Sequence, residues 1–330
     1  MSSTAATTTS TANRNRTAQP RPPTKKSAKK VATSPYNVSL TEAQIIDRIQ
    51  GRLHRLGLAK GNGIVTGIGD DCAIFRQRGA ANDLTFTADM MHEGVHFTWD
   101  EDPRDVGHKA LARSLSDCAA MGAKPLFCLV SLAFPAEAAE WLDGFYDGLT
   151  KLAKKHKVVL AGGDLSNTPK ISCDVTVCGQ VPRGQSLLRS NARPGDRICV
   201  SGPVGRAALA LDTRARYIPQ PKLELGETLR KLGVKCAMDL SDGLSQDLAR
   251  LCTASNCAAE LTDIPIAKGA TLQHALHGGE DYELLFTLPK NIKPPAKTYI
   301  IGHIAKGPAG HVNYHGQPLP PQGWDHFRPQ

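Results

Sequence analysis

Glycine stands next to an acidic residue at several widely spaced points of this 330-residue chain. The densest of these points is the segment Gly67-Ile68-Gly69-Asp70-Asp71-Cys72, where two glycines precede two adjacent carboxylates. Glycine lets the backbone turn tightly and approach a ligand closely. Two carboxylates about 4 Å apart repel by roughly 4 kcal/mol at an effective dielectric constant of about 20, and a bound divalent cation removes that repulsion. The segment therefore indicates either a cation site or an ordinary surface turn, in which Asp bonds to its own backbone.

Similar segments recur along the chain and favour the cation site. They are Asp89 at the end of an expected strand, Gly162-Gly163-Asp164, Asp239-Leu240-Ser241-Asp242-Gly243 and Gly278-Gly279-Glu280-Asp281. Asp117 adds a further acid on an otherwise apolar helical stretch, where a carboxylate is costly to bury without a partner. If these acids converge, they predict a site for several Mg²⁺ ions, whose usual role is to hold a polyphosphate. The Walker A lysine loop, the protein-kinase loops and the G-x-S-x-G motif are all absent from the sequence.

Composition sets the class of protein and the division of the chain. A hydrophobic content of 41% and a charged content of 22% are typical of a globular protein, and no apolar run is long enough to span a bilayer. The formal net charge is +9, but residues 1–37 carry seven basic residues and no acid, so 9 minus 7 leaves +2 on the rest. We predict a disordered basic tail over residues 1–37, and expect no nucleic-acid contact on the folded body.

The nine cysteines form no C-x-x-C pair, so a zinc site is not expected. Several stand among apolar residues, as Cys128 does, where cysteine acts as a small hydrophobic side chain. With no recognisable signal peptide, the chain is expected to be reduced and cytoplasmic.

Segments with helical and strand periodicity alternate in both halves, which predicts an α/β (α+β) fold. Helices are expected from a capping box at Ser39, from Pro103 to Met121, over 136–156, from Gly205, over 222–232 and after Gly243. Strands are expected over 84–89, 126–134, 158–161, 171–181, 197–201, 236–240, 259–261 and 282–288. The turn-rich segment 191–196 predicts a boundary between a first domain, 38–190, and a second, 191–330.

The motifs, taken together, resemble those of thiamine-monophosphate kinases. In order, they are GIGDDCA, TADM, GVHF, KALARSLSDCAAMGAKP, LAGGD, LLRS, ARPGD, MDLSDGLSQDL, GGEDYELLF and a final WDHF. The resemblance covers about residues 40–328. It implies an AIR-synthetase-like fold with an N-terminal mixed sheet that dimerises and a C-terminal α/β domain. The implied enzyme is a homodimer that makes thiamine diphosphate from thiamine monophosphate and ATP, using several Mg²⁺ ions and usually K⁺.

The resemblance also implies roles for individual residues. Metal ions would be held by Asp71, Thr87, the backbone carbonyl of Ala88, Asp89, Asp117, Asp164, Asp239 and Asp242. ATP would contact Tyr146, Gly163, Asp164, Arg189 and Ser241, and thiamine monophosphate would contact His96, Glu280 and Trp324.

The chemistry of the substrates agrees with an acid-rich site. A phosphate monoester is mostly dianionic at pH 7, so the acceptor needs no general base but must be screened from the nucleotide. Direct in-line transfer is then mainly a matter of positioning and charge neutralisation, and no phosphoenzyme is expected. The alternatives are another ATP-dependent enzyme of the wider group, such as an AIR synthetase or a selenophosphate synthetase, and a binding protein without turnover. Locally, Asp242 could instead cap a helix, Asp70 could only shape its turn, and Asp281 competes with Glu280 for the substrate role.

Overall fold

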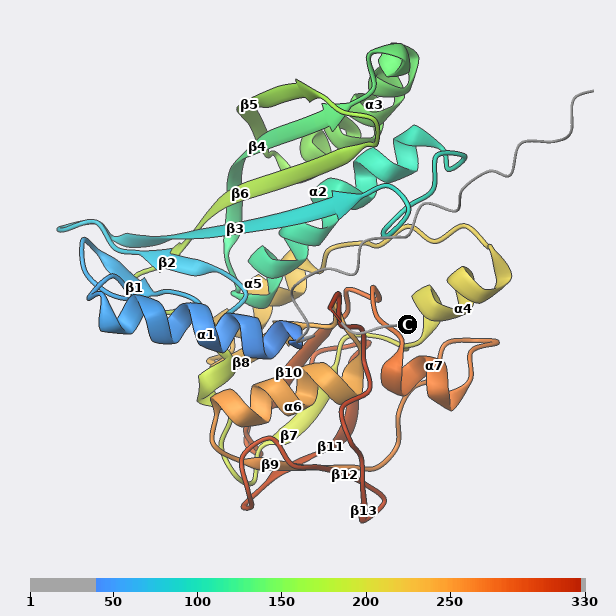
Figure 1. Cartoon of the computed structure of the whole chain (residues 1–330). Coiled ribbons are helices and arrows are strands. Elements are labelled where there is room, and N and C mark those ends of the chain that lie inside the picture. Colours follow the sequence, from blue (N-terminus) through green and yellow to red (C-terminus); the bar gives the residue numbers. More distant parts are fainter. Residues whose placement is uncertain (1–39, 328–330) are drawn as a thin grey trace, which may run out of the picture. The chain divides into compact units, whose positions relative to one another are not determined.

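Two β-sheets organise the computed structural model, which describes residues 40–327 (Figure 1). One sheet is formed by residues 64–182 and the other by residues 197–318. Each contains both parallel and antiparallel pairs, and helices pack against both, which confirms the α/β (α+β) class. Contacts group the described residues, 40–327, as one compact unit, so the division at residue 190 stays a prediction. The predicted tail, 1–37, lies outside the described residues.

The first sheet has the strand order β1-β2-β3-β6-β4-β5, in which only β4 and β5 pair in parallel. Its strands are β1 (Ile64–Thr66), β2 (Ala73–Phe75), β3 (Asn82–His92), β4 (Lys124–Phe134), β5 (Val159–Asn167) and β6 (Ser172–Pro182). Buried and exposed residues alternate along β3, so one face of the sheet is covered and the other is open.

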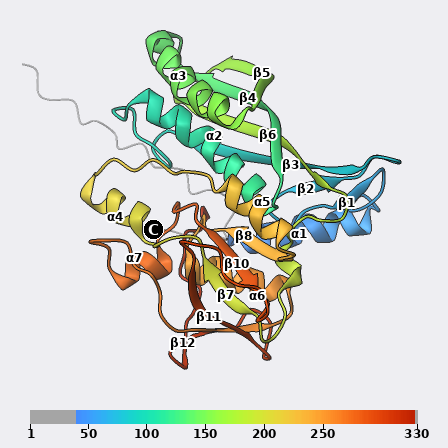
Figure 2. The same cartoon turned by 180° about the vertical axis from the view of Figure 1, so that it is seen from behind.

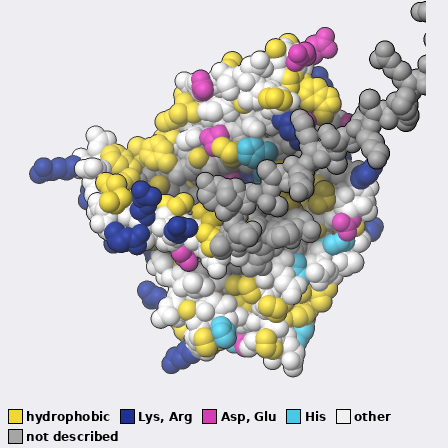
Figure 3. All heavy atoms as spheres, viewed as in Figure 1, with side chains coloured by type: hydrophobic (Ala, Val, Ile, Leu, Met, Phe, Trp, Pro, Cys, Tyr) yellow, Lys and Arg dark blue, Asp and Glu magenta, His cyan; other side chains and the backbone are white. Residues whose placement is uncertain are grey.

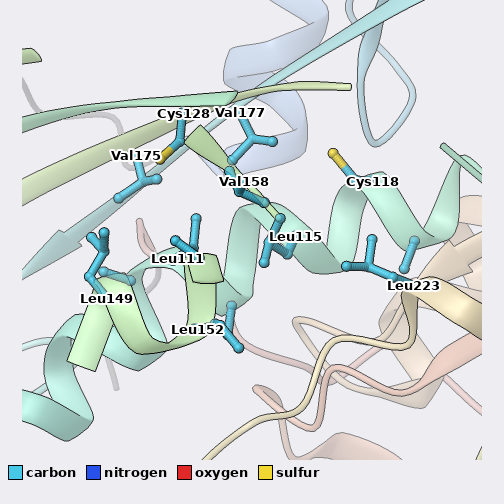
Figure 4. Close-up of a cluster of buried hydrophobic side chains, with 14 of the residues drawn as sticks. Leu111, Leu115, Cys118, Cys128, Leu149, Leu152, Val158, Val175, Val177 and Leu223 are labelled. Carbon is cyan, nitrogen blue, oxygen red and sulfur yellow. The ribbon is translucent and has the colours of Figure 1, made fainter. Parts of the chain in front are cut away.

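Helices α2 (Pro103–Ala120) and α3 (Ala139–His156) cover the buried face, and the short 3₁₀ turn η1 (Ala136–Ala138) precedes α3. Helix α2 begins where Asp102 accepts a hydrogen bond from the backbone of Arg104, with proline in the first turn. Figure 4 shows the resulting core, in which α2, α3 and β6 contribute Leu111, Leu115, Leu149, Leu152, Val175 and Val177.

Gly107 of α2 and Gly148 of α3 allow the two helices to approach closely, and Gly148 leads to a strong prediction. A Cβ added to Gly148 would lie 1.8 Å from the carbonyl oxygen of Arg104, which neither backbone can accommodate without moving. We expect Gly148→Ala to lower the free energy of unfolding by about 3 kcal/mol, measured by urea denaturation. The control is Gly51→Ala in helix α1 (Glu42–Arg55), where the added carbon meets only the Arg55 side chain at 3.6 Å. That change should stabilise the protein by about 0.5–1 kcal/mol, and equal effects at both glycines would contradict the prediction.

The second sheet has the order β13-β12-β9-β11-β7-β10-β8, and its one parallel pair is β9 with β12. Its strands are β7 (Arg197–Val200), β8 (Cys236–Asp239), β9 (Ala258–Leu261), β10 (Leu284–Leu288), β11 (Tyr299–Ala305), β12 (Val312–Tyr314) and β13 (Gln317–Pro318). The remaining helices are α4 (Arg206–Thr213), α5 (Leu223–Lys231), α6 (Leu244–Ala254), α7 (Leu272–His277) and the 3₁₀ turn η2 (Arg189–Asn191).

Along β8 and β10, successive side chains point to opposite faces of this sheet, and one of these faces packs against helix α2, which lies between the two sheets. Ala237 and Phe286 face the core that contains α2 and α5, whereas Met238 and Leu285 face the core that contains α6. The view from behind shows α5 beside α2 and next to β8 and β10 (Figure 2). The C-terminal end of α2 therefore lies near the end of β8, where Asp239 stands.

The structure corrects several expected element boundaries. Asp89 lies inside β3 rather than at a strand end, and Asp164 lies inside β5 rather than in a loop. Gly162 and Gly163 remain in the strand with φ of 154° and 155°, values that glycine adopts readily. The capping box of α1 is formed by Thr41 and Gln44, so the prediction of a cap at Ser39 is wrong. Strands β1, β2, β11, β12 and β13 and helix α7 were not expected.

The open face of the first sheet carries exposed apolar side chains. Met90 of β3 is 53% exposed, and Leu129 of β4 is 39% exposed. Hydrophobic side chains gather in Figure 3 over the region that the first sheet occupies in Figure 1. Between residues 40 and 327, no helix combines the length and hydropathy needed to cross a membrane.

Candidate active site

Three acidic side chains from distant parts of the sequence meet at one point. Asp71 follows β1, Asp117 lies in the last turn of α2, and Asp239 ends β8; each offers a carboxylate oxygen, and these oxygens lie within 4.8 Å of one another. Burial, followed by the neighbouring carboxylates, raises the pKa of Asp117 and of Asp239 well above the ordinary value. Such an arrangement is unfavourable unless a cation or protons neutralise the charge.

Specific contacts hold these carboxylates in place. The Oγ1 atom of Thr87 donates a hydrogen bond to Asp117, and the guanidinium of Arg189 binds Asp71 through Nη2 at 2.5 Å and Nε at 3.3 Å. The backbone N–H of Arg189 also donates to Asp70, whose pKa is raised to about 7 by burial and by Asp71. Arg189 was expected to contact ATP, and in the structure its guanidinium binds the Asp71 carboxylate through two N–H groups.

Strand β3 supplies the next metal candidates beside this acid triad. Thr87 and Asp89 alternate onto the face covered by α2, and the charge of Asp89 contributes to the raised pKa of Asp117. The Oδ2 atom of Asp89 is buried without a hydrogen-bond partner among the described residues. The side chain of Ala88 points to the open face, so only its backbone could take part.

Two of the expected contact residues lie away from the triad within one chain. Gly163 and Asp164 are on β5, and strands β6 and β4 separate β5 from β3, so the two strands are roughly 14 Å apart at about 4.8 Å per strand. Asp164 pairs with Ser131 on the open face, opposite to the face of Asp89. Tyr146 lies on α3, half-buried, with its ring edge-on to Phe145.

The loop before α6 places Ser241 and Asp242 next to Asp239, but Asp242 does not cap the helix. The N-cap residue is Gly243, and the backbone N–H groups of Asp242 and Gly243 donate to the Asp247 carboxylate at 3.0 and 3.1 Å. Asp242 instead forms an ion pair with Arg250. Burial and Asp242 raise the pKa of Asp247 to about 7. The position of Asp247 in the first turn of α6 was the sequence signal that could have predicted its bonds to the N-terminal N–H groups.

The expected substrate residues form a continuous group beside these acids. The N–H of Trp324 donates to the carbonyl of Asp242 at 2.9 Å, and its ring packs edge-on to His326, which lies 5.2 Å from the ring of His96. Burial and the charge of Arg113 lower the pKa of His96 to about 4, so this imidazole is neutral at pH 7.

The structure separates the two candidate acids of the Gly-Gly-Glu-Asp segment. Asp281 is buried, and its carboxylate accepts hydrogen bonds from the backbone N–H groups of Gly205 and Ala207 at the start of α4. Glu280 faces the site, where Lys109 and Arg113 of α2 bind its two oxygens at 3.3 and 3.2 Å.

The sequence analysis did not identify Lys109 and Arg113. Their spacing of one helical turn within KALAR was the signal that could have found them.

Comparisons with known proteins identify the family of this chain. Residues 69–181 match the family model "AIR synthase related protein, N-terminal domain". A curated thiamine-monophosphate kinase of Salmonella typhimurium is 38% identical over 254 residues, which are 69% of this chain and 77% of that protein. The chain belongs to the thiamine-monophosphate kinase family.

Solved structures of this family have the same fold. The structure of AaThiL complexed with AMPPCP and TMP superposes with a TM-score of 0.79 at 29% identity, covering 88% of this chain and all of that one. The thiamine-monophosphate kinase from Stenotrophomonas maltophilia gives a TM-score of 0.67 at 36% identity, covering 83% and 96% of the two chains. This thiamine-monophosphate kinase family member has the AIR-synthetase-like fold expected from its motifs, and is an enzyme of the phosphotransferase class.

The acid triad of this family member fits hard divalent cations. Carboxylate oxygens are the ligands that Mg²⁺ prefers, and several are present here at short mutual distances. The raised pKa values of Asp117 and Asp239 and the unpartnered oxygen of Asp89 fit a set of carboxylates whose charge bound cations would neutralise.

Proposed function

We propose that this protein transfers the γ-phosphoryl group of ATP directly to thiamine monophosphate, giving thiamine diphosphate. The observation that carries the proposal is the meeting of Asp71, Asp117 and Asp239 beside the group that contains His96 and Trp324. The solved structure of AaThiL complexed with AMPPCP and TMP supports the choice of both substrates.

The proposed site has metal ligands, ATP contacts and acceptor contacts. Several Mg²⁺ ions, when bound, would screen the charges of nucleotide and acceptor from each other. The proposed metal ligands are Asp71, Thr87, the Ala88 carbonyl, Asp89, Asp117, Asp164, Asp239 and Asp242; the proposed ATP contacts are Tyr146, Gly163, Asp164, Arg189 and Ser241. His96, Glu280 and Trp324 would hold the acceptor, and the indole of Trp324 suits stacking on a cationic ring. The acceptor phosphate attacks as a dianion, so no side chain has to remove a proton.

The direct test is to incubate the protein with ATP, Mg²⁺ and thiamine monophosphate, with and without K⁺, and to separate the thiamine esters by chromatography. We expect thiamine diphosphate and ADP in equal amounts, and no labelled protein with [γ-³²P]ATP alone. Bound ATP without thiamine diphosphate would favour the binding-protein alternative and reject the proposal.

A homodimer would explain why Asp164 lies apart from the other acids. The open face of the first sheet carries exposed apolar side chains, among them Met90 and Leu129, and Asp164 lies on the same face. We propose that this face meets a second copy, so that Gly163 and Asp164 of one protomer complete the site of the other.

Mixing two inactive variants tests this arrangement. Asp117→Asn and Asp164→Asn should each be inactive alone, but subunit exchange between them should restore roughly a quarter of wild-type activity, because half of the dimers are mixed and each has one intact site. Turnover that stays absent, in mixtures shown by mass spectrometry to contain mixed dimers, would place Asp164 in the site of its own chain.

A further inference from the structure

Two buried cations on α2 stand next to the metal candidates. Lys109 and Arg113 are one helical turn apart, and their side chains are only 14% and 12% exposed. Both bind the same carboxylate, Glu280, one on each oxygen. Burying a charge is costly unless it is paired, and Glu280 is the carboxylate that lies within hydrogen-bond distance of both cations.

Arg113 keeps unused hydrogen-bonding capacity on the side facing Asp89. Its Nε atom is buried and, within residues 40–327, has no hydrogen-bond partner. It lies 3.9 Å from the Oδ1 atom of Asp89, which is too long for a hydrogen bond, and Oδ2 of Asp89 is also unpartnered. A buried donor and a buried acceptor thus face each other across a gap. An anion that binds the donor while a metal ion binds the acceptor satisfies both groups.

The position of this pair along the site identifies the anion. Trp324, His326 and His96 lie in ring contact, the carbonyl of His96 accepts from Lys109 at 2.9 Å, and Arg113 then adjoins Asp89. A substrate with its rings at Trp324 and His96 therefore has its phosphate beside Lys109 and Arg113, next to the acids. Arginine can bind a phosphate through two parallel N–H groups, which lysine cannot do.

The backbone of the facing loop agrees with a functional constraint at this place. Glu280 and Tyr282 both have positive φ, 63° and 51°, which non-glycine residues adopt at a cost of about 1–3 kcal/mol. The Tyr282 ring lies 5.9 Å beneath the guanidinium of Arg113 and orients it. The loop thus holds Glu280 against both cations. Glu280 accepts a hydrogen bond from Nη1 of Arg113, and the Nε donor of the same guanidinium stays unpaired in the described part of the chain.

We propose that Lys109 and Arg113 form an anion subsite that binds the phosphate monoester of the acceptor, so that the enzyme selects thiamine monophosphate over thiamine. This inference rests on the proposed function for the identity of the acceptor. The cation pair, with its free Nε donor, gives the subsite a preference for a dianionic phosphate.

Calorimetric binding of thiamine monophosphate in the presence of Mg²⁺ and AMPPCP tests the subsite without turnover. We expect Arg113→Gln to raise the Kd for thiamine monophosphate about tenfold or more, because a charge-assisted hydrogen bond is lost. Arg113→Lys should recover part of the affinity, and Lys109→Gln should weaken binding in the same direction. The Kd values for thiamine and for AMPPCP should stay within about twofold, and the exposed Arg104→Gln on the same helix should change nothing.

Unchanged binding of thiamine monophosphate in Arg113→Gln, or an equal loss of AMPPCP affinity, would overturn the subsite. If Arg113→Gln does not fold, as judged by circular dichroism, the same comparison is made with Arg113→Lys and Lys109→Gln. If Arg113→Gln binds thiamine monophosphate more weakly than wild type, but the wild-type protein makes no thiamine diphosphate, the proposed function is rejected and the subsite is kept.

Discussion

Asp117→Asn should lower kcat roughly a thousandfold and, at the same time, raise the thermal stability of the metal-free protein by a few degrees. The carboxylate is buried close to Asp71 and Asp239, so removing its charge relieves repulsion in the folded state. The amide keeps the size of the side chain and can still accept the hydrogen bond of Thr87. Activity is lost because one metal ligand and its charge are gone.

The two readouts together separate a catalytic role from a structural one. In Asp117→Asn, kcat from steady-state kinetics should fall, whereas the Tm from differential scanning calorimetry in EDTA should rise. Asp147→Asn, an exposed acid on α3, serves as the control and should leave both values near wild type. A variant that loses activity and stability together would mean that Asp117 serves the fold, and retained activity would remove it from the site.

Mg²⁺ should stabilise the protein more at pH 8.5 than at pH 6.5. Burial raises the pKa of Asp70 and of Asp247 to about 7, and raises the pKa of Asp117 and Asp239 well above the ordinary value. An acid with a raised pKa in the folded state binds more protons there than in the unfolded chain, so the free energy of unfolding falls as pH rises from about 4 through the folded-state value. The lowered pKa of His96 acts in the opposite direction below about pH 6.5, so the comparison begins there.

Thermal unfolding with EDTA and with millimolar MgCl₂ measures this effect. In EDTA the Tm should fall between pH 6.5 and 8.5, and Mg²⁺ should recover most of the loss, because a ligand that binds only the folded state stabilises it. Asp117→Asn should show a smaller fall and a smaller recovery. A Tm in EDTA that rises between pH 6.5 and 8.5, or a Tm that is the same in EDTA and in MgCl₂, would contradict the interpretation of the acid triad.

Local sequence patterns predicted most of the elements that carry the site. The apolar spacing after Pro103 predicted α2, and the short apolar run at Cys236 predicted β8, because each pattern depends on neighbours a few residues away. Glycine next to an acid was less reliable: at Asp164 it predicted a loop where the chain continues as a strand, because pairing with β4 overrides the local preference.

The sequence by itself determined that acids stand in glycine-rich or apolar surroundings, on segments whose periodicity indicates a helix or a strand. Only the tertiary structure decided that Asp71, Asp117 and Asp239 converge, that Glu280 rather than Asp281 faces the site, and that Asp164 lies three strands away. Residue spacing reports which side chains share a face, but not what that face meets. That second question is settled by how α2 packs between two sheets, and this packing depends on contacts between residues far apart in the chain.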